Sequence, residues 1–177
     1  GNHTDHNHGR VLAGAVNLDN IAVAAPNELN LIRIKSAGYP QFEVDIADLA
    51  IDEAQYYTSS SIVKGICARM KALGYDIGGF DACIDGRVPK GSGLSSSASF
   101  EVLIGSILSH LFNNGKLEAV ENAMIGQWAE NNYFGKPCGL MDQTACAVGG
   151  LITIDFEDPA SPVVKALDFD FVATGYS

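Results

Sequence analysis

Glycines, hydroxyl groups and unpaired backbone amides converge where the segment Pro89–Ser99 runs into an apolar helical pattern. The first turn of a helix carries N–H groups without an intrahelical partner and about half a positive charge, so it attracts anions. Gly91 and Gly93 let an anion approach the backbone, and the serines at 95–97 add a helix cap, hydroxyl donors and an oxygen ligand for a metal ion. This pattern predicts an anion site, with a nucleotide phosphate as the first candidate. An ordinary Gly/Ser loop before a helix is the alternative, and neither GxxxxGK[ST] nor GxGxxG is present.

A second polar cluster lies at the amino end, where His3, Asp5, His6 and His8 fall within one short segment. These side chains could chelate a metal ion, but ligands crowded into one loop rarely reach the tetrahedral geometry of zinc, and no cysteine accompanies them. A loop that binds a hydroxyl-rich ligand is the stronger interpretation, because Asp accepts two hydroxyl donors and His can donate or accept. The third interpretation is a solvent-exposed turn whose histidines have no functional role.

A third cluster combines Glu130 with the segment 135–143, which ends in Asp142 and Gln143. A carboxylate that follows a loop shaped by glycine and proline can be held rigidly beside a ligand, which suits a general base or a group that organises charge. The ordinary alternative is that Asp142 caps a short helix. Both interpretations remain open from this segment alone.

The elements that must position these clusters follow the order strands, helices, strands, which is typical of an α+β domain. The first four strand patterns are expected to form an antiparallel meander. We predict strands over residues 11–16, 21–25, 29–35, 42–46, 80–84, 151–156, 163–167 and 171–174. We predict helices over residues 56–73, 96–112, 117–132 and 140–148.

The composition indicates one ordered domain, since the 177 residues are 47% hydrophobic and 18% charged. Eleven Lys and Arg stand against 21 Asp and Glu, a formal charge of −10, which argues against an extended nucleic-acid surface. Four cysteines form no CxxC pair and are too few for a disulfide scaffold, so a reducing compartment fits best. With no apolar run as long as a bilayer span, we expect a cytoplasmic protein that binds no membrane. The chain opens within a motif rather than on Met, so we expect a fragment.

Together, the three clusters resemble the N-terminal domain of the galactokinases, which belong with homoserine, mevalonate and phosphomevalonate kinases to one superfamily of sugar and metabolite kinases. The signature GEHTDYN is seen at residues 1–7 as GNHTDHN, and the phosphate loop Pro-x-x-x-Gly-Leu-Ser-Ser-Ser-Ala matches residues 89–98. The motif Gly-x-Pro-Cys-Gly-x-Met-Asp-Gln matches residues 135–143. The resemblance covers residues 1–156 and implies an α+β fold of the ribosomal protein S5 domain 2 type, a mixed sheet with helices packed on it.

The resemblance implies transfer of the γ-phosphate of ATP to the anomeric hydroxyl of D-galactose, with Mg²⁺, to give α-D-galactose 1-phosphate. Kinases for galacturonic acid, arabinose or N-acetylgalactosamine share this scaffold, and Asn2 stands where the family usually carries Glu. The sugar preference therefore stays open. An alternative from a different functional class is a regulatory protein that binds galactose and ATP but does not catalyse phosphoryl transfer.

The resemblance also implies a role for individual residues. Asp142 would take the proton of the anomeric hydroxyl or orient its oxygen. The sugar would be bound by Asn2, His3, Asp5, Gly139 and Asp142. The ATP phosphates would be bound by Lys90, Gly91, Ser92, Gly93, Leu94, Ser95, Ser96, Ser97 and Ala98. Mg²⁺ would be held by Ser97 and Glu130.

Residues 1–177 would then be the sugar- and ATP-binding domain of a kinase, without the first strand and the C-terminal ferredoxin-like domain of the family. We expect such a fragment to be inactive alone. It should expose a sheet edge and an apolar patch, through which copies could associate.

Overall fold

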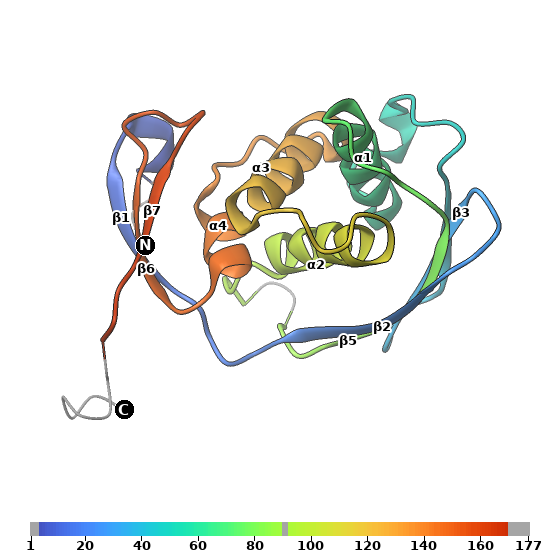
Figure 1. The fold of residues 1–177 in the computed structure, drawn as a ribbon, viewed down its shortest axis with the longest axis horizontal. Coiled ribbons are helices and arrows are strands. Elements are labelled where there is room, and N and C mark those ends of the chain that lie inside the picture. Colours follow the sequence, from blue (N-terminus) through green and yellow to red (C-terminus); the bar gives the residue numbers. More distant parts are fainter. Residues whose placement is uncertain (1–3, 90–91, 170–177) are drawn as a thin grey trace.

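The computed structural model describes residues 4–89 and 92–169, in which two β-sheets and four helices pack together (Figure 1). The helices are α1 (Ser59–Ala72), α2 (Ser96–Phe112), α3 (Ala119–Ala129) and α4 (Met141–Val148). The strands are β1 (Arg10–Gly14), β2 (Asn20–Pro26), β3 (Leu31–Ser36), β4 (Phe42–Asp45), β5 (Phe80–Gly86), β6 (Leu151–Asp155) and β7 (Val163–Ala166). The α+β class is confirmed, and the strand pattern at 171–174 lies outside the described residues.

The antiparallel meander predicted for the first four strands is wrong. One sheet has the order β2-β5-β3-β4 and the other β1-β6-β7. Strand β5 enters after α1 and separates β2 from β3, pairing antiparallel with the first and parallel with the second. Only the β3–β4 hairpin belongs to the expected arrangement. The alternation of a strand shows which face is buried, but it does not show which strand is its neighbour.

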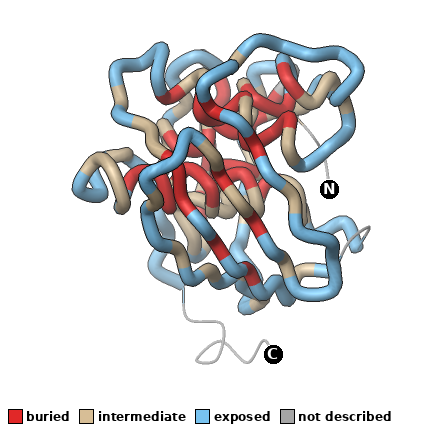
Figure 2. The backbone as a smooth tube through the Cα atoms, turned by 90° about the vertical axis from the view of Figure 1, so that its right-hand side faces the viewer, coloured by how far each residue is buried: buried red, intermediate tan, exposed pale blue. Residues whose placement is uncertain are grey.

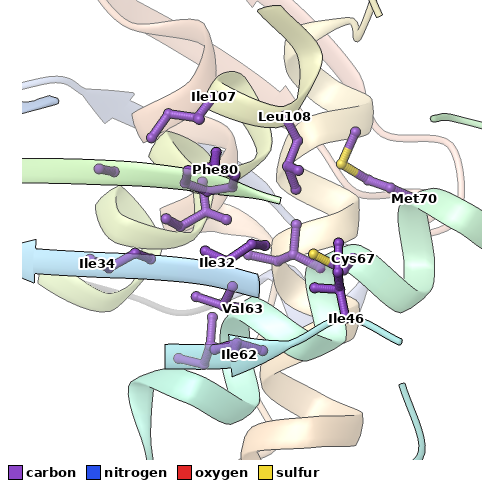
Figure 3. Close-up of a cluster of buried hydrophobic side chains, with 14 of the residues drawn as sticks. Ile32, Ile34, Ile46, Ile62, Val63, Cys67, Met70, Phe80, Ile107 and Leu108 are labelled. Carbon is purple, nitrogen blue, oxygen red and sulfur yellow. The ribbon is translucent and has the colours of Figure 1, made fainter. Parts of the chain in front are cut away.

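The main core lies between the four-stranded sheet and helices α1, α2 and α3 (Figures 1 and 3). On β3, Ile32 and Ile34 are fully buried, while Arg33 and Lys35 lie on the opposite face, as the period of two requires. Helix α1 supplies Ile66 to the same core. Figure 2 shows that buried positions gather within the helices and strands, whereas the connecting loops are mostly exposed. The helix that carries the serine segment is therefore anchored against a rigid sheet.

A second, smaller core joins the three-stranded sheet to the helices. Ile152, Ile154 and Phe156 are fully buried and cluster with Ala123 of α3 and Leu140. Leu140 immediately precedes α4, so this core holds the start of α4, and with it Asp142, between the sheet and α3.

Two helix ends differ from the prediction for local reasons. Helix α1 begins at Ser59 rather than at residue 56, because Tyr57 has a positive φ of 65° and the Thr58 side chain accepts the Ser61 N–H at 3.2 Å. Helix α3 ends at Ala129, and a π-helical turn continues over Glu130–Phe134. The predicted bounds of α2, residues 96–112, are confirmed.

Apolar side chains are exposed along strands at the sheet edges. Among the described strands, β1 pairs only with β6, and its Leu12 is 65% exposed. On the edge strand β2, Val23 is 77% exposed. Association of copies through this surface stays a prediction. Within the described ranges, no helix has both the length and the apolar character that crossing a membrane requires.

Candidate active site

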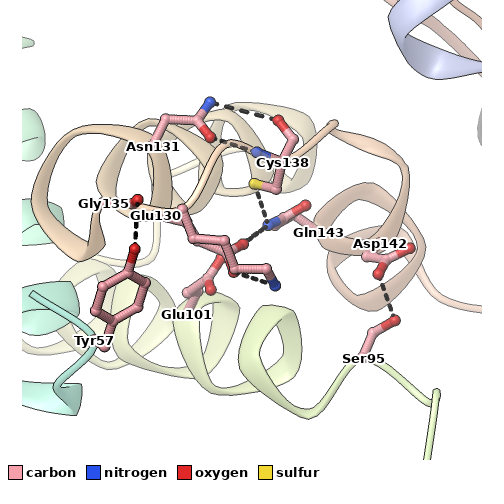
Figure 4. A network of polar contacts seen from close by, with 10 residues as sticks. Tyr57, Ser95, Glu101, Glu130, Asn131, Gly135, Cys138, Asp142 and Gln143 are labelled. Atoms are coloured by element: carbon pink, nitrogen blue, oxygen red, sulfur yellow. Dashed lines mark hydrogen bonds and ion pairs between the residues drawn. The ribbon is translucent and has the colours of Figure 1, made fainter.

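The serine segment turns directly toward α4. Ser95 is the residue before α2 and has left-handed backbone angles (φ 58°, ψ 47°). Its hydroxyl donates to Asp142 Oδ2 at 2.7 Å (Figure 4). The helix cap that we expected from these serines is not made by the Ser95 side chain, because its hydroxyl is directed to α4 instead. The phosphate-loop candidate and the catalytic candidate are thus joined by one hydrogen bond.

Asp142 does not cap the short helix, so the ordinary interpretation of this residue is wrong. Leu140 occupies the position before α4, and Asp142 lies inside its first turn. Its carboxylate borders two hollows, of about 190 Å³ and about 730 Å³. Gly93 and Ser95 also line the larger one. The smaller is lined by Asp5, Ser97, Ala98, Glu130, Lys136, Cys138, Gly139, Asp142 and Gln143.

Asp5 is the described part of the amino-end cluster that reaches this cavity. It is 5% exposed, and its Oδ2 accepts the N–H of Met141, the first residue of α4, at 3.3 Å. A carboxylate at the start of a helix satisfies an unpaired donor and complements the helix dipole. Gly139 approaches so closely that a Cβ there would overlap Asp5 Oδ2. The amino end and the 135–143 segment therefore form one packed unit.

Other predicted residues cannot be placed at the site. Asn2, His3, Lys90 and Gly91 lie outside the described residues. His8 is exposed, and its Nδ1 lies 2.9 Å from the backbone oxygen of Glu157, away from the cavity residues. In residues 4–89 and 92–169, no three His, Cys, Asp or Glu side chains gather into a cluster that could hold a metal ion by such side chains alone.

Glu130 is buried at the centre of a polar network (Figure 4). Its Oε2 accepts from Gln143 Nε2 at 3.0 Å, and its Oε1 lies 3.2 Å from Lys136 Nζ. The same Gln143 nitrogen also donates to Glu101 Oε2 at 3.0 Å. Glu101 and Gln143 are 0% and 1% exposed. Two buried carboxylates are therefore bridged by one amide.

The π-helical turn that begins at Glu130 brings the loop after it back to this residue. A wide turn at the end of a helix shifts the following side chains relative to an α-helix, and such turns are frequent at functional sites. The Lys136 N–H returns to the Glu130 carbonyl at 3.2 Å, and Gly135 takes a positive φ of 79° that suits glycine. The loop thus places Glu130 and Lys136 side by side.

The electrostatics of this network favour a neutral Glu101. Burial, and after it the charge of the neighbouring Glu130, raise the pKa of Glu101 to about 8. Glu130 also raises the pKa of Lys136, whose side chain remains 56% exposed. Glu130 is therefore paired with the ammonium group of Lys136, whereas Glu101 is held in its protonated form at neutral pH.

Residues 61–150 match the family model described as the GHMP kinases N terminal domain. The chain belongs to the GHMP kinases. Residues 1–26 match the galactokinase galactose-binding signature. The galactokinase of Clostridium tetani (strain Massachusetts / E88) is 36% identical over 150 residues, which are 84% of this chain and 38% of that protein.

Solved structures agree with this assignment. The crystal structure of Lactococcus lactis galactokinase complexed with galactose superposes with a TM-score of 0.83 at 30% identity, over 96% of this chain and 45% of that one. The Methanococcus jannaschii mevalonate kinase has a TM-score of 0.73 at 19% identity, over 96% of this chain and 52% of that one, and shows the fold alone. The resemblance to galactokinase N-terminal domains and the expected fold type are confirmed. This chain spans less than half the length of the galactokinases it matches.

In this GHMP kinase chain, Ser97 and Glu130 line the same cavity and offer hydroxyl and carboxylate oxygens. Mg²⁺ prefers hard oxygen ligands and is commonly bound by one or two protein groups together with substrate phosphates and water. The donor set fits that ion. The Lys136 side chain is more than half exposed, so it can move away from Glu130 Oε1 and leave that oxygen available to the ion.

Sequence reasoning missed Glu101 and gave no role to Lys136 or Gln143. Glu101 had a usable signal, because it lies on the face of α2 that carries the buried residues Ile104 and Leu108. A charged side chain on the apolar stripe of a helix is unusual unless it has a partner. Gln143 had no comparable signal, since its two partners come from other helices.

The cysteines of this kinase chain should differ in reactivity. Burial and then Glu130 raise the pKa of Cys138, and burial and then Asp142 raise the pKa of Cys146 to about 11. Cys83 is exposed. Because the thiolate is the nucleophile, we expect iodoacetamide at pH 7.5 to label Cys83 at least about tenfold faster than the other two. Peptide mass spectrometry over a time course measures this, and equally fast labelling of Cys138 would contradict it.

Proposed function

We propose that the protein containing this chain transfers the γ-phosphoryl group of ATP to the anomeric hydroxyl of D-galactose, and that residues 1–177 are its sugar- and ATP-binding domain. The proposal rests on one observation: a single cavity of about 190 Å³ is lined by Asp5, Ser97, Glu130 and Asp142. These residues come from the three segments that resemble galactokinase motifs. The galactokinases it resembles support the choice of sugar.

In this proposal, Asp142 accepts the proton of the anomeric hydroxyl or orients its oxygen toward the γ-phosphorus. The Ser95 hydroxyl, 2.7 Å from Oδ2, fixes the carboxylate in place. Asp5, held by Met141 N–H and packed against Gly139, binds another sugar hydroxyl. Asn2 and His3, which precede it in the sequence, are proposed to bind the sugar as well. Positioning of this kind replaces a bimolecular encounter with an oriented one.

The phosphates of ATP would lie along residues 90–98, where backbone N–H groups and serine hydroxyls donate to them. Mg²⁺, when bound, neutralises charge on the transferred group. Ser97 and Glu130 would hold that ion. Lys136, beside Glu130, would add a positive charge at the same place.

The proposed partners are a small sugar and ATP, with no nucleic acid. The chain carries a formal charge of −10, which disfavours a polyanion surface. We also propose a cytoplasmic location, because Cys67, Cys83, Cys138 and Cys146 are all free thiols, as expected in a reducing compartment.

An ADP-release assay on the full-length protein tests the proposal, with D-galactose, galacturonic acid, arabinose and N-acetylgalactosamine as acceptors. D-galactose should give the highest kcat/KM. A higher kcat/KM for another sugar would contradict the proposed substrate but not the proposed reaction. Asn2, which stands where the family usually carries Glu, is the position at which we expect a change of sugar preference to arise. Ligand-induced stabilisation by galactose and ATP without ADP release would favour a regulator instead.

A further inference from the structure

Glu101 of α2 reaches the cavity region without lining it. It is fully buried, and its Oε2 accepts from Gln143 Nε2 at 3.0 Å. That nitrogen also donates to Glu130 Oε2 at 3.0 Å. A side-chain amide carries two N–H bonds, so one hydrogen serves each carboxyl group. The Gln143 amide is therefore held between two carboxyl groups, and Cys138 Sγ lies 3.6 Å from the same nitrogen (Figure 4).

Neighbouring elements leave this bridge little freedom. A Cβ on Gly126 of α3 would lie 3.0 Å from Glu101 Cβ, 3.1 Å from Glu101 Oε2 and 3.6 Å from Gln143 Cγ. Helix α3 thus closes over both side chains. Gln143 follows Asp142 directly in α4, whose first N–H is bound by Asp5.

A purely structural role explains Glu101 poorly. A buried carboxyl group costs free energy, and an apolar side chain at such a position is often neutral or stabilising. Ile104 and Leu108 show that the surrounding face of α2 accepts apolar residues. Glu101 Oε1 and Gln143 Oε1 are buried without a hydrogen-bond partner among the described residues, so the network is not optimised for stability.

We propose that Glu101 and Gln143 are positioning residues that orient the Glu130 carboxylate for Mg²⁺ bound with a nucleotide phosphate. Their bridge occupies Glu130 Oε2 and leaves Oε1 to face Lys136, whose exposed side chain can move away. Without the bridge, Glu130 can rotate, and its oxygens are no longer held toward the cavity. This inference rests on the proposed function, because it assumes that Glu130 binds the ion.

The test compares nucleotide binding with and without Mg²⁺ in the full-length protein, using a non-hydrolysable ATP analogue and calorimetry. Glu101→Met removes the acceptor but keeps the volume of the side chain. We expect it to raise the Kd for the magnesium form about tenfold, because removal of groups that orient metal ligands commonly costs 10–100-fold. The Kd for the metal-free form and for galactose should change less than about twofold, because the bridge contacts neither. Glu101→Gln retains an oxygen acceptor and should largely restore magnesium binding.

A double-mutant cycle tests whether both residues act through one bridge. Gln143→Met should weaken magnesium-nucleotide binding as much as Glu101→Met does. The double variant should be no weaker than either single variant, because the second change removes nothing further. Ile104→Val, on the same face of α2, is the matched control and should lower thermal stability without changing the magnesium dependence.

Loss of thermal stability with an unchanged ratio of magnesium to metal-free affinity would overturn the inference, as would additive effects in the cycle. If Glu101→Met does not fold, the magnesium dependence of nucleotide binding in Gln143→Met and in Gly126→Ala tests the inference instead. The methyl group added in Gly126→Ala crowds Glu101 from α3. A wild-type protein that binds no magnesium nucleotide would instead overturn the proposed function.

Discussion

Replacing Asp142 by Asn is expected to lower kcat of the full-length protein with galactose and ATP by at least about 100-fold, the usual contribution of a positioned general base. Asn matches the shape of Asp and can still accept from the Ser95 hydroxyl, which lies 2.7 Å from Oδ2. It loses the negative charge and the basicity that a proton acceptor requires. Steady-state kinetics should show the loss in kcat, with KM for galactose changed only a few fold.

Ser95→Ala is the control for Asp142. It removes the hydrogen bond that fixes the carboxylate but leaves the carboxylate itself. We expect a loss of kcat of less than about tenfold, since one supporting hydrogen bond contributes about 1 kcal/mol. An Asp142→Asn enzyme that keeps more than a tenth of the wild-type kcat would show that Asp142 is not the principal proton acceptor.

Gly139→Ala should raise KM for galactose by about tenfold or more and lower kcat as well. A Cβ at this position would overlap Asp5 Oδ2 and crowd Asp5 Cγ, so the carboxylate must move. Asp5 also accepts the first N–H of α4, the helix that carries Asp142. Small displacements of positioning groups can reduce rates about 100-fold, which is why one methyl group should affect both constants.

The matched control is Gly14→Ala. Its Cβ would make only an ordinary contact, 3.6 Å from Leu151 Cδ1, and Gly14 has no positive φ. Gly14 also lines the larger hollow, but the added methyl group contacts neither Asp5 nor Asp142, so this variant should keep both kinetic constants within about twofold of wild type. Wild-type KM in Gly139→Ala would mean that Asp5 does not contact the sugar.

Much of the local structure could be predicted because it depends on short-range patterns. The apolar spacing after Ser95 defines α2 over residues 96–112, and the alternation on β3 identifies Ile32 and Ile34 as the buried side. The start of α1 could not be predicted, since Tyr57 adopts a positive φ of 65° that no local pattern indicates. Beyond the β3–β4 hairpin, the order of this sheet could not be read, because β5 follows α1 in the chain yet lies between β2 and β3, and the alternation of a strand does not identify its neighbours.

The amino-acid sequence by itself determined the chemistry of this protein, since the serine loop, Glu130 and Asp142 carry their functional groups wherever they lie. The family and the fold type follow from those motifs in their order. Only the tertiary structure decided which groups meet. Ser95 bonds to Asp142, Asp5 caps α4, and Gln143 joins Glu101 to Glu130. These contacts join segments that are far apart in the sequence, because a single tertiary arrangement buries both hydrophobic cores. A local sequence pattern shows only that each segment has a buried face, not which other segment covers it.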